Sequence, residues 1–201
     1  MLLGGGAFNA AHADDYSSML AYLTHSRIDG SVLNGSSGAI ALNVAAGDQN
    51  QQANLRVLAA GDTAAAYIRA HQQQRDNRTE APAVAHASIG GGALGRVSGL
   101  VSINQASGTA NAQLNTASVV LAPPGIREAS SNQWFADVCA CTQQAASVVP
   151  GSPESRPRTR SAAVEGDALR GAQGIVQLNQ IAGSHNLTAN HLSIDLGVTP
   201  R

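Results

Sequence analysis

The chain has 201 residues, of which 3% are aromatic and 12% are charged, and its formal net charge is −1 at pH 7. So few large side chains argue against a conventional globular core and favour thin β layers held together by backbone hydrogen bonds. The near-neutral charge offers no electrostatic footprint for nucleic acid or an anionic membrane, and no segment approaches the roughly 18 continuous apolar residues of a membrane-spanning helix.

Residues 1–27 precede a set of internal repeats. Ala11-His12-Ala13 has the small-x-small form of a signal-peptidase site, so we interpret residues 1–13 as the remnant of a signal peptide and expect a secreted protein. Because the apolar run before this site is short and lacks a basic segment, the alternative is an ordinary Ala/Gly-rich terminus. Residues 14–27 form a leader, in which Asp14–His25 is a candidate short helix.

A block of 31 residues then occurs three times, at Ile28–Leu58, Ile89–Val119 and Val164–Ile194. The blocks keep their length, whereas the two linkers between them differ in length and share no pattern. Repeats of this kind usually stack on their neighbours and bury a shared core. Seven columns hold the same residue in every copy: Gly30/Gly91/Gly166, Leu33/Leu94/Leu169, Gly38/Gly99/Gly174, Asn43/Asn104/Asn179, Gly47/Gly108/Gly183, Asn50/Asn111/Asn186 and Asn54/Asn115/Asn190.

The centre of each block alternates between aliphatic residues and small or polar ones, as at Ile40, Leu42 and Val44 of the first copy. This period of two predicts a half-buried strand. A further strand is expected around Ile28–Leu33, so each block should contain three or four short strands. Glycine adopts backbone angles that other residues resist, so the expected corners are Gly30, Gly38, Gly47, Gly91, Gly99, Gly108, Gly166, Gly174 and Gly183.

Side-chain amides recur at a spacing of two after the second corner, which places them on one face of a strand. If equivalent layers stack about 4.8 Å apart, each amide can donate to one neighbouring layer and accept from the other. The alternative is turn-forming asparagine without a ladder. The predicted ladder residues are Asn43, Asn50, Gln52, Asn54, Asn104, Asn111, Gln113, Asn115, Asn179, Asn186 and Asn190, whereas Thr188 replaces the glutamine of the third copy.

The two linkers, residues 59–88 and 120–163, carry the remaining features. Ala64–Arg75 is a candidate helix in the first linker, and the second has a composition typical of disordered segments. The second linker also contains Cys139 and Cys141, which are candidates for an intermolecular disulfide or for contact with a processing factor. A zinc site would need about two more ligands.

These features predict an all-β fold, a β-solenoid with one Greek-key-like layer per block, three stacked layers, irregular or partly helical linkers and a tail at 195–201. The first and last layers would expose unpaired strand edges, which invite another copy of the chain. The sequence contains no recognisable catalytic, phosphate-binding or metal-binding motif, so we expect no enzyme, no cofactor and no metal site.

The segments Gly38–Asn54 and Gly99–Asn115 resemble the repeats of the Fap functional-amyloid proteins of Pseudomonas-type bacteria, which have three imperfect repeats and two variable linkers. The resemblance implies a secreted structural subunit that leaves through the periplasm and an outer-membrane pore. It implies self-assembly into extracellular cross-β fibres of a biofilm matrix. The implied partners are the chain itself, related fibre subunits and the secretion pore, without nucleic acid and without membrane insertion.

One departure from the family concerns the cysteines. Fibre subunits of the family tend to carry Cys-x-x-Cys near the C-terminus, whereas Cys139-x-Cys141 lies in the second linker. Three roles within a fibre therefore stay open: major subunit, nucleator and minor component. The alternative functions are a monomeric β-solenoid adhesin and a fibre-assembly chaperone or accessory protein.

Overall fold

The computed structural model describes residues 23–61, 64, 66–74, 82, 84–122, 137–142 and 159–197. These residues form an all-β structure with parallel sheets, and none of them is helical, so the all-β part of the predicted fold class is confirmed. No helix that is long and apolar enough to cross a membrane occurs among them. The strands are β1 (Leu23–Ile28), β2 (Ser37–Ala46), β3 (Gln51–Ala60), β4 (Arg69–Gln74), β5 (Val84–Ile89), β6 (Ser98–Ser107), β7 (Ala112–Ala122), β8 (Asp137–Thr142), β9 (Thr159–Val164), β10 (Gln173–Ala182) and β11 (Leu187–Gly197).

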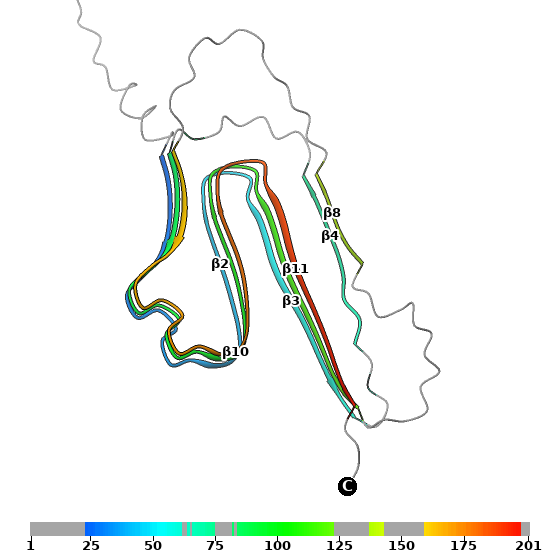
Figure 1. Cartoon of the computed structure of the whole chain (residues 1–201). Coiled ribbons are helices and arrows are strands. Elements are labelled where there is room, and N and C mark those ends of the chain that lie inside the picture. Colours follow the sequence, from blue (N-terminus) through cyan, green and yellow to red (C-terminus); the bar gives the residue numbers. More distant parts are fainter. Residues whose placement is uncertain are drawn as a thin grey trace, which may run out of the picture.

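Nine of these strands form three stacked layers. We call β1–β3 layer 1, β5–β7 layer 2 and β9–β11 layer 3. Equivalent strands pair in parallel, in the orders β1-β5-β9, β2-β6-β10 and β3-β7-β11, so layer 2 lies between the other two. Figure 1 looks along the stack, and the chain follows the same serpentine path in every layer. The register is free of slips, and asparagines 43, 104 and 179 are direct partners.

The layers are longer than the 31-residue blocks. Each layer begins with a strand that ends where the block starts, and its last strand ends two or three residues after the block. The expected strand at Ile28–Leu33 is wrong, because the first strand is Leu23–Ile28 and a turn occupies most of residues 29–36. The last residues of the candidate helix at Asp14–His25 belong to β1. Its residues 14–22 and the expected signal-peptide remnant at 1–13 lie outside the described residues.

The corner glycines are required where one layer packs closely on the next. A Cβ atom added to Gly47 would lie 2.2 Å from the carbonyl oxygen of Gly108, and one added to Gly108 would lie 1.9 Å from that of Gly183. A Cβ on Gly99 would likewise lie 2.3 Å from the carbonyl oxygen of Gly38. These contacts involve backbone atoms that cannot move aside, so the stack excludes any side chain at these positions.

Leucine, not only glycine, takes left-handed backbone angles in the first turn. Leu33, Leu94 and Leu169 have φ values of 56°, 58° and 62°. Such angles are strained for leucine, and neighbouring structure must hold them. Leu94 is fully buried in the core, with Leu33 and Leu169 packed against it, so the burial of the apolar side chains offsets the backbone strain.

The apolar core lies between the sheet of β1, β5 and β9 and the sheet of β2, β6 and β10. Its central members come mainly from layer 2, with Ile89, Leu94, Val101 and Ile103 at 0% exposure. Equivalent residues of the outer layers, such as Ile40, are only partly buried because one side of each outer layer has no neighbour. The stack is therefore closed in its middle and open at both ends.

The two remaining strands come from the linkers and correct two further expectations. Within the candidate helix Ala64–Arg75, residues 69–74 form strand β4, and β8 lies inside the linker that was expected to be irregular. The two strands pair in parallel as a separate sheet. The side chain of Gln72 donates to the backbone oxygen of Gln113 at 3.2 Å, which ties β4 to the main stack.

Candidate functional site

The predicted amide residues line the space between the β2 and β3 sheets. Asn104 Nδ2 lies 3.0 Å from Asn43 Oδ1, and Asn179 Nδ2 lies 3.0 Å from Asn104 Oδ1. The same pattern joins residues 54, 115 and 190 at 2.9 and 3.0 Å, and residues 50, 111 and 186 at 3.0 Å each. Each set of three asparagines is thus a continuous column through all three layers.

All three asparagine columns run in the same direction. In every case the side-chain amide of layer 3 donates to layer 2, and that of layer 2 donates to layer 1. The first and second columns are also joined sideways, since Asn115 Nδ2 lies 3.0 Å from Asn104 Oδ1. The stack is therefore polar, with unused side-chain acceptors on the open side of layer 3 and amide donors on the open side of layer 1.

The asparagines of layer 2 depend most on having hydrogen-bond partners, because Asn104, Asn111 and Asn115 are all 0% exposed. A buried amide is stable only when its donors and acceptor are paired. Asn104 satisfies this by donating to Asn43, Asn54 and the backbone oxygen of Ala53.

We expect Asn104→Ala to lower the free energy of unfolding by about 1–3 kcal/mol, because it leaves buried partners unpaired. Urea unfolding of the soluble chain, below the concentration at which it associates, measures this. Asn43→Ala is the matched control, since Asn43 is exposed in layer 1 and its loss should cost less. Equal losses in the two variants would contradict the burial argument.

The glutamine column is incomplete. Gln52 Nε2 lies 2.5 Å from Gln113 Oε1, and Gln113 Nε2 continues to the backbone oxygen of Asn179 at 3.1 Å. Thr188 occupies the third place, and its hydroxyl oxygen is buried without a hydrogen-bond partner. This column donates from layer 1 towards layer 3, opposite to the asparagines.

A second glutamine column lies in the apolar interior between β1 and β2 and was missed by the sequence analysis. Gln180 Nε2 lies 2.9 Å from Gln105 Oε1, and Gln105 donates to the backbone oxygens of Ser26 and Ser88 at 2.9 Å each. Val44 holds the third place, in layer 1. The sequence signal that could have revealed this column is the glutamine that two blocks share at equivalent positions, Gln105 and Gln180, on a strand face whose other residues are aliphatic.

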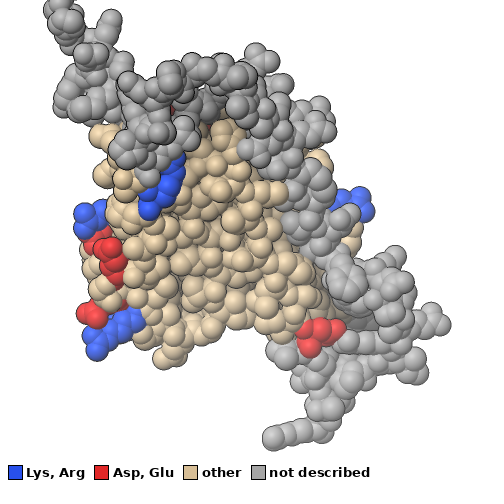
Figure 2. Space-filling model, turned by 45° about the horizontal axis from the view of Figure 1, so that its top comes forward, with Lys and Arg blue, Asp and Glu red and all other residues tan. Residues whose placement is uncertain are grey.

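The middle sheet of the stack is free of charge, whereas the flanking strands of the outer layers carry charged residues such as Arg27, Arg56 and Arg160. Strands β2, β6 and β10 contain no charged residue. Figure 2 shows one face of the molecule, in which uncharged residues form a broad continuous area and the described charged residues lie towards its margins. Such a surface meets little electrostatic repulsion from a second copy.

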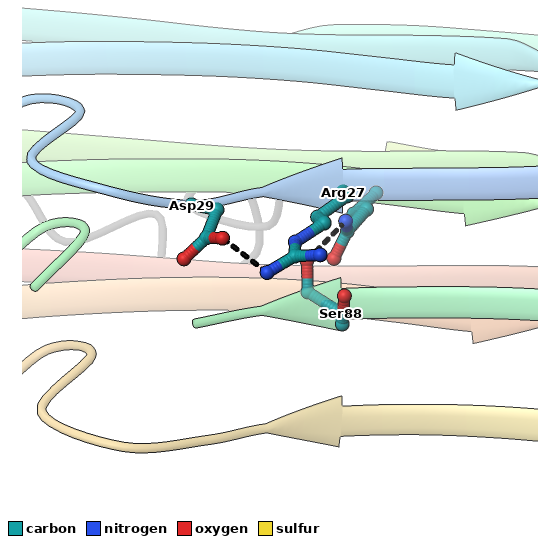
Figure 3. Close-up of polar contacts among 4 residues, drawn as sticks. Arg27, Asp29 and Ser88 are labelled. Atoms are coloured by element: carbon teal, nitrogen blue, oxygen red, sulfur yellow. Dashed lines mark hydrogen bonds and ion pairs between the residues drawn. The ribbon is translucent and has the colours of Figure 1, made fainter. Parts of the chain in front are cut away.

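Five of the described charged residues lie in the first turns of the three layers: Asp29, Arg96, Glu165, Asp167 and Arg170. Figure 3 shows Arg27 of β1 reaching Asp29 in the turn that follows, with Ser88 of β5 in the next layer. The backbone N–H of Gly30 and the Arg27 guanidinium hold the pKa of Asp29 below its ordinary value. Asp29 therefore stays ionised to a lower pH than a free aspartate, and its ion pair with Arg27 lies within layer 1.

The glycines at the two ends differ from those inside the stack. A Cβ added to Gly38 of layer 1 would meet no atom within 4 Å, and one added to Gly183 of layer 3 would meet nothing closer than 3.3 Å. Their equivalents inside the stack would clash with a backbone oxygen at about 2 Å, as for Gly99 and Gly108. Both open sides thus keep glycine where no backbone atom of the molecule itself would clash with a side chain.

The predicted cysteines lie apart from these columns. Cys139 and Cys141 belong to β8, where their backbone partners are His71 and Gln73 of β4. Across the part of the chain that the structure describes, no group of three or more His, Cys, Asp or Glu residues is placed to hold a metal ion.

Residues 6–197 match the family model of the functional amyloid protein FapB/FapC family. No solved structure matches the chain.

Proposed function

The chain belongs to the functional amyloid protein FapB/FapC family, and from this premise we propose that it is a secreted structural subunit that self-assembles into extracellular cross-β fibres. In the proposed fibre, layer 3 of one copy stacks on layer 1 of the next, so that the layers form one long β-solenoid. The fibres belong to a bacterial biofilm matrix. We propose a structural role and no catalytic one.

The polarity of the asparagine columns carries this proposal. Layer 3 offers free side-chain oxygens at Asn179, Asn186 and Asn190, and layer 1 offers amide donors at the matching places. A head-to-tail joint extends all three columns without a break. A joint between two copies of layer 3 would place oxygen against oxygen and would reverse the strands.

The residues that meet in such a joint also match in shape. Layer 1 and layer 3 share the same residue in all seven identical columns, including the close-packed corners at Gly38/Gly174 and Gly47/Gly183. The core columns meet as Ile28 with Val164 and Leu42 with Leu178. A heterologous contact that does not close on itself generates an open filament.

The proposal has a direct test in the mass of the fibre per unit length. Three layers about 4.8 Å apart occupy about 14 Å of the axis, so each 20.4 kDa chain should account for about 14 Å. Fibre diffraction of the purified full chain should show the corresponding reflection of about 4.8 Å along the axis, and electron microscopy of unstained fibres measures the mass.

Two results would contradict this proposal. One is a chain that stays monomeric at high concentration, which would favour an adhesin or an assembly chaperone. The other is a mass per length about three times larger, which would mean that each chain contributes a single layer.

The route to the cell surface is part of the proposal and rests on the family. We propose export through the periplasm and an outer-membrane pore, with related fibre subunits as further partners. Deletion of the pore in the producing bacterium should leave the chain inside the cell envelope, which fractionation followed by immunoblotting detects.

A further inference from the structure

The two glutamine columns are each interrupted once, and both interruptions lie at an end of the stack. The column between β2 and β3 has Gln52 and Gln113 but ends in layer 3 with Thr188. The column between β1 and β2 has Gln105 and Gln180 but begins in layer 1 with Val44. If layer 3 meets layer 1 of the next copy, both interruptions fall in the same joint.

We propose that the joint between copies is weaker than the contacts between layers within one chain, and that Thr188 and Val44 are responsible for the difference. The inference rests on the proposed function, because it concerns the contact between layer 3 of one copy and layer 1 of a second. Inside the chain, one glutamine–glutamine bond links layers 1 and 2, and another links layers 2 and 3. The joint between copies has neither.

The first interruption removes a side-chain donor. Gln113 reaches forward to the backbone of layer 3, and a glutamine at position 188 would reach forward in the same way to the next copy. Threonine ends at the γ position and is too short to do so. The hydroxyl of Thr188 is already buried without a partner, so the joint places Gln52 of the next copy against an unpaired group.

The second interruption removes an amide from the other side of the joint. Gln105 accepts a hydrogen bond from Gln180 of the layer that follows it. In the joint, the residue that follows Gln180 is Val44 of the next copy, whose side chain has no polar atom to offer. The three asparagine columns still cross the joint, so the contact keeps its register while losing two of its links.

Restoring the glutamines should strengthen the fibre. A hydrogen bond of this kind contributes about fivefold to an equilibrium, so Thr188→Gln fibres should lose subunits about five times more slowly than wild type. Thr188→Gln/Val44→Gln fibres should lose them roughly 25 times more slowly, since the two columns lie in separate interiors. Dilution of preformed, seeded fibres, followed by release of soluble chain, measures the rate.

The matched control is Ala189→Gln, which adds the same side chain to the exposed outer face of β11, outside both columns. It should release subunits at the wild-type rate. Urea unfolding of each soluble variant shows whether the substitution disturbs the chain itself. Thr188→Gln is the safer single test, because Val44 packs against the core.

Different results would overturn fibre assembly and the weak joint between copies. Wild-type chain that forms no fibres would overturn the proposed function. Fibres that form normally, but dissociate equally fast in wild type and in a folded Thr188→Gln variant, would overturn only the weak joint. Slower release in Ala189→Gln to the same extent would also overturn it, because the effect would then come from added amide surface.

Discussion

Gly183→Ala is expected to stop fibre growth while leaving the three layers of each chain intact. Inside the stack, the Cβ of the equivalent Gly108 would lie 1.9 Å from a backbone oxygen of the following layer. Layer 3 has no following layer within its own chain, so there an alanine Cβ at position 183 meets only side-chain atoms, the nearest being Asn186 Nδ2 at 3.3 Å, and the backbone clash arises only when a second copy arrives. We expect no detectable fibre by dye binding or electron microscopy, because backbone atoms of the next copy cannot move aside.

The control for this prediction must share its backbone strain. Gly183 has φ 143°, and Gly61 has φ 151°, with nothing within 4 Å of an added Cβ. The place that corresponds to Gly61 in layer 2 is held by Ala122, so a Cβ is compatible with stacking there. Gly61→Ala should therefore assemble like wild type. If both variants fail, strain rather than the joint is responsible, and the interpretation of Gly183 is wrong.

The features that could be predicted from the sequence are those in which the same residue recurs from copy to copy. The strands β2, β6 and β10 follow from the alternation of aliphatic residues, and membership of the Fap family followed from the asparagines and glycines at fixed spacing. In-register stacking makes this possible, because a column of asparagines or close-packed glycines tolerates few other residues. The same residue therefore recurs at the equivalent position of each block in the sequence.

Other features left no such mark. Strands β1, β5 and β9 share little sequence, because most of the side chains of β1 and β9 are partly or fully exposed and tolerate different residues. Strand β4 is rich in glutamine, and single-sequence patterns favoured a helix there. Its strand conformation depends on pairing with β8, a segment more than sixty residues away. Tertiary contacts of this kind override local propensity.

A mixture of two non-polymerising variants is expected to form a dimer and nothing larger. A Cβ on Gly99 or Gly174 points at a backbone oxygen of the preceding layer, at 2.3 Å in each case. By the same geometry, Gly38→Ala blocks the open side of layer 1, whereas Gly183→Ala blocks the open side of layer 3. Each variant alone keeps one open side that can still stack, but the complementary side is blocked in every copy of the same variant.

The polarity of the stack decides what the mixture does. Layer 3 of the Gly38→Ala chain is intact and fits layer 1 of the Gly183→Ala chain, whereas every other pairing contains a clash. The product is one heterodimer with twice the 20.4 kDa mass, whose two outer sides are both blocked. Light scattering after size-exclusion chromatography should show monomer for each variant alone and dimer for an equimolar mixture.

The same two variants should cap existing fibres from opposite ends. A Gly183→Ala chain can add through its layer 1 to the fibre end that exposes layer 3, and growth then stops there. A Gly38→Ala chain stops growth at the other end. Small amounts of both together should halt elongation of wild-type seeds, whereas either alone should leave one end growing. Homodimers of Gly183→Ala, or full arrest by a single variant, would contradict a head-to-tail joint, because only an interface between like sides gives those results.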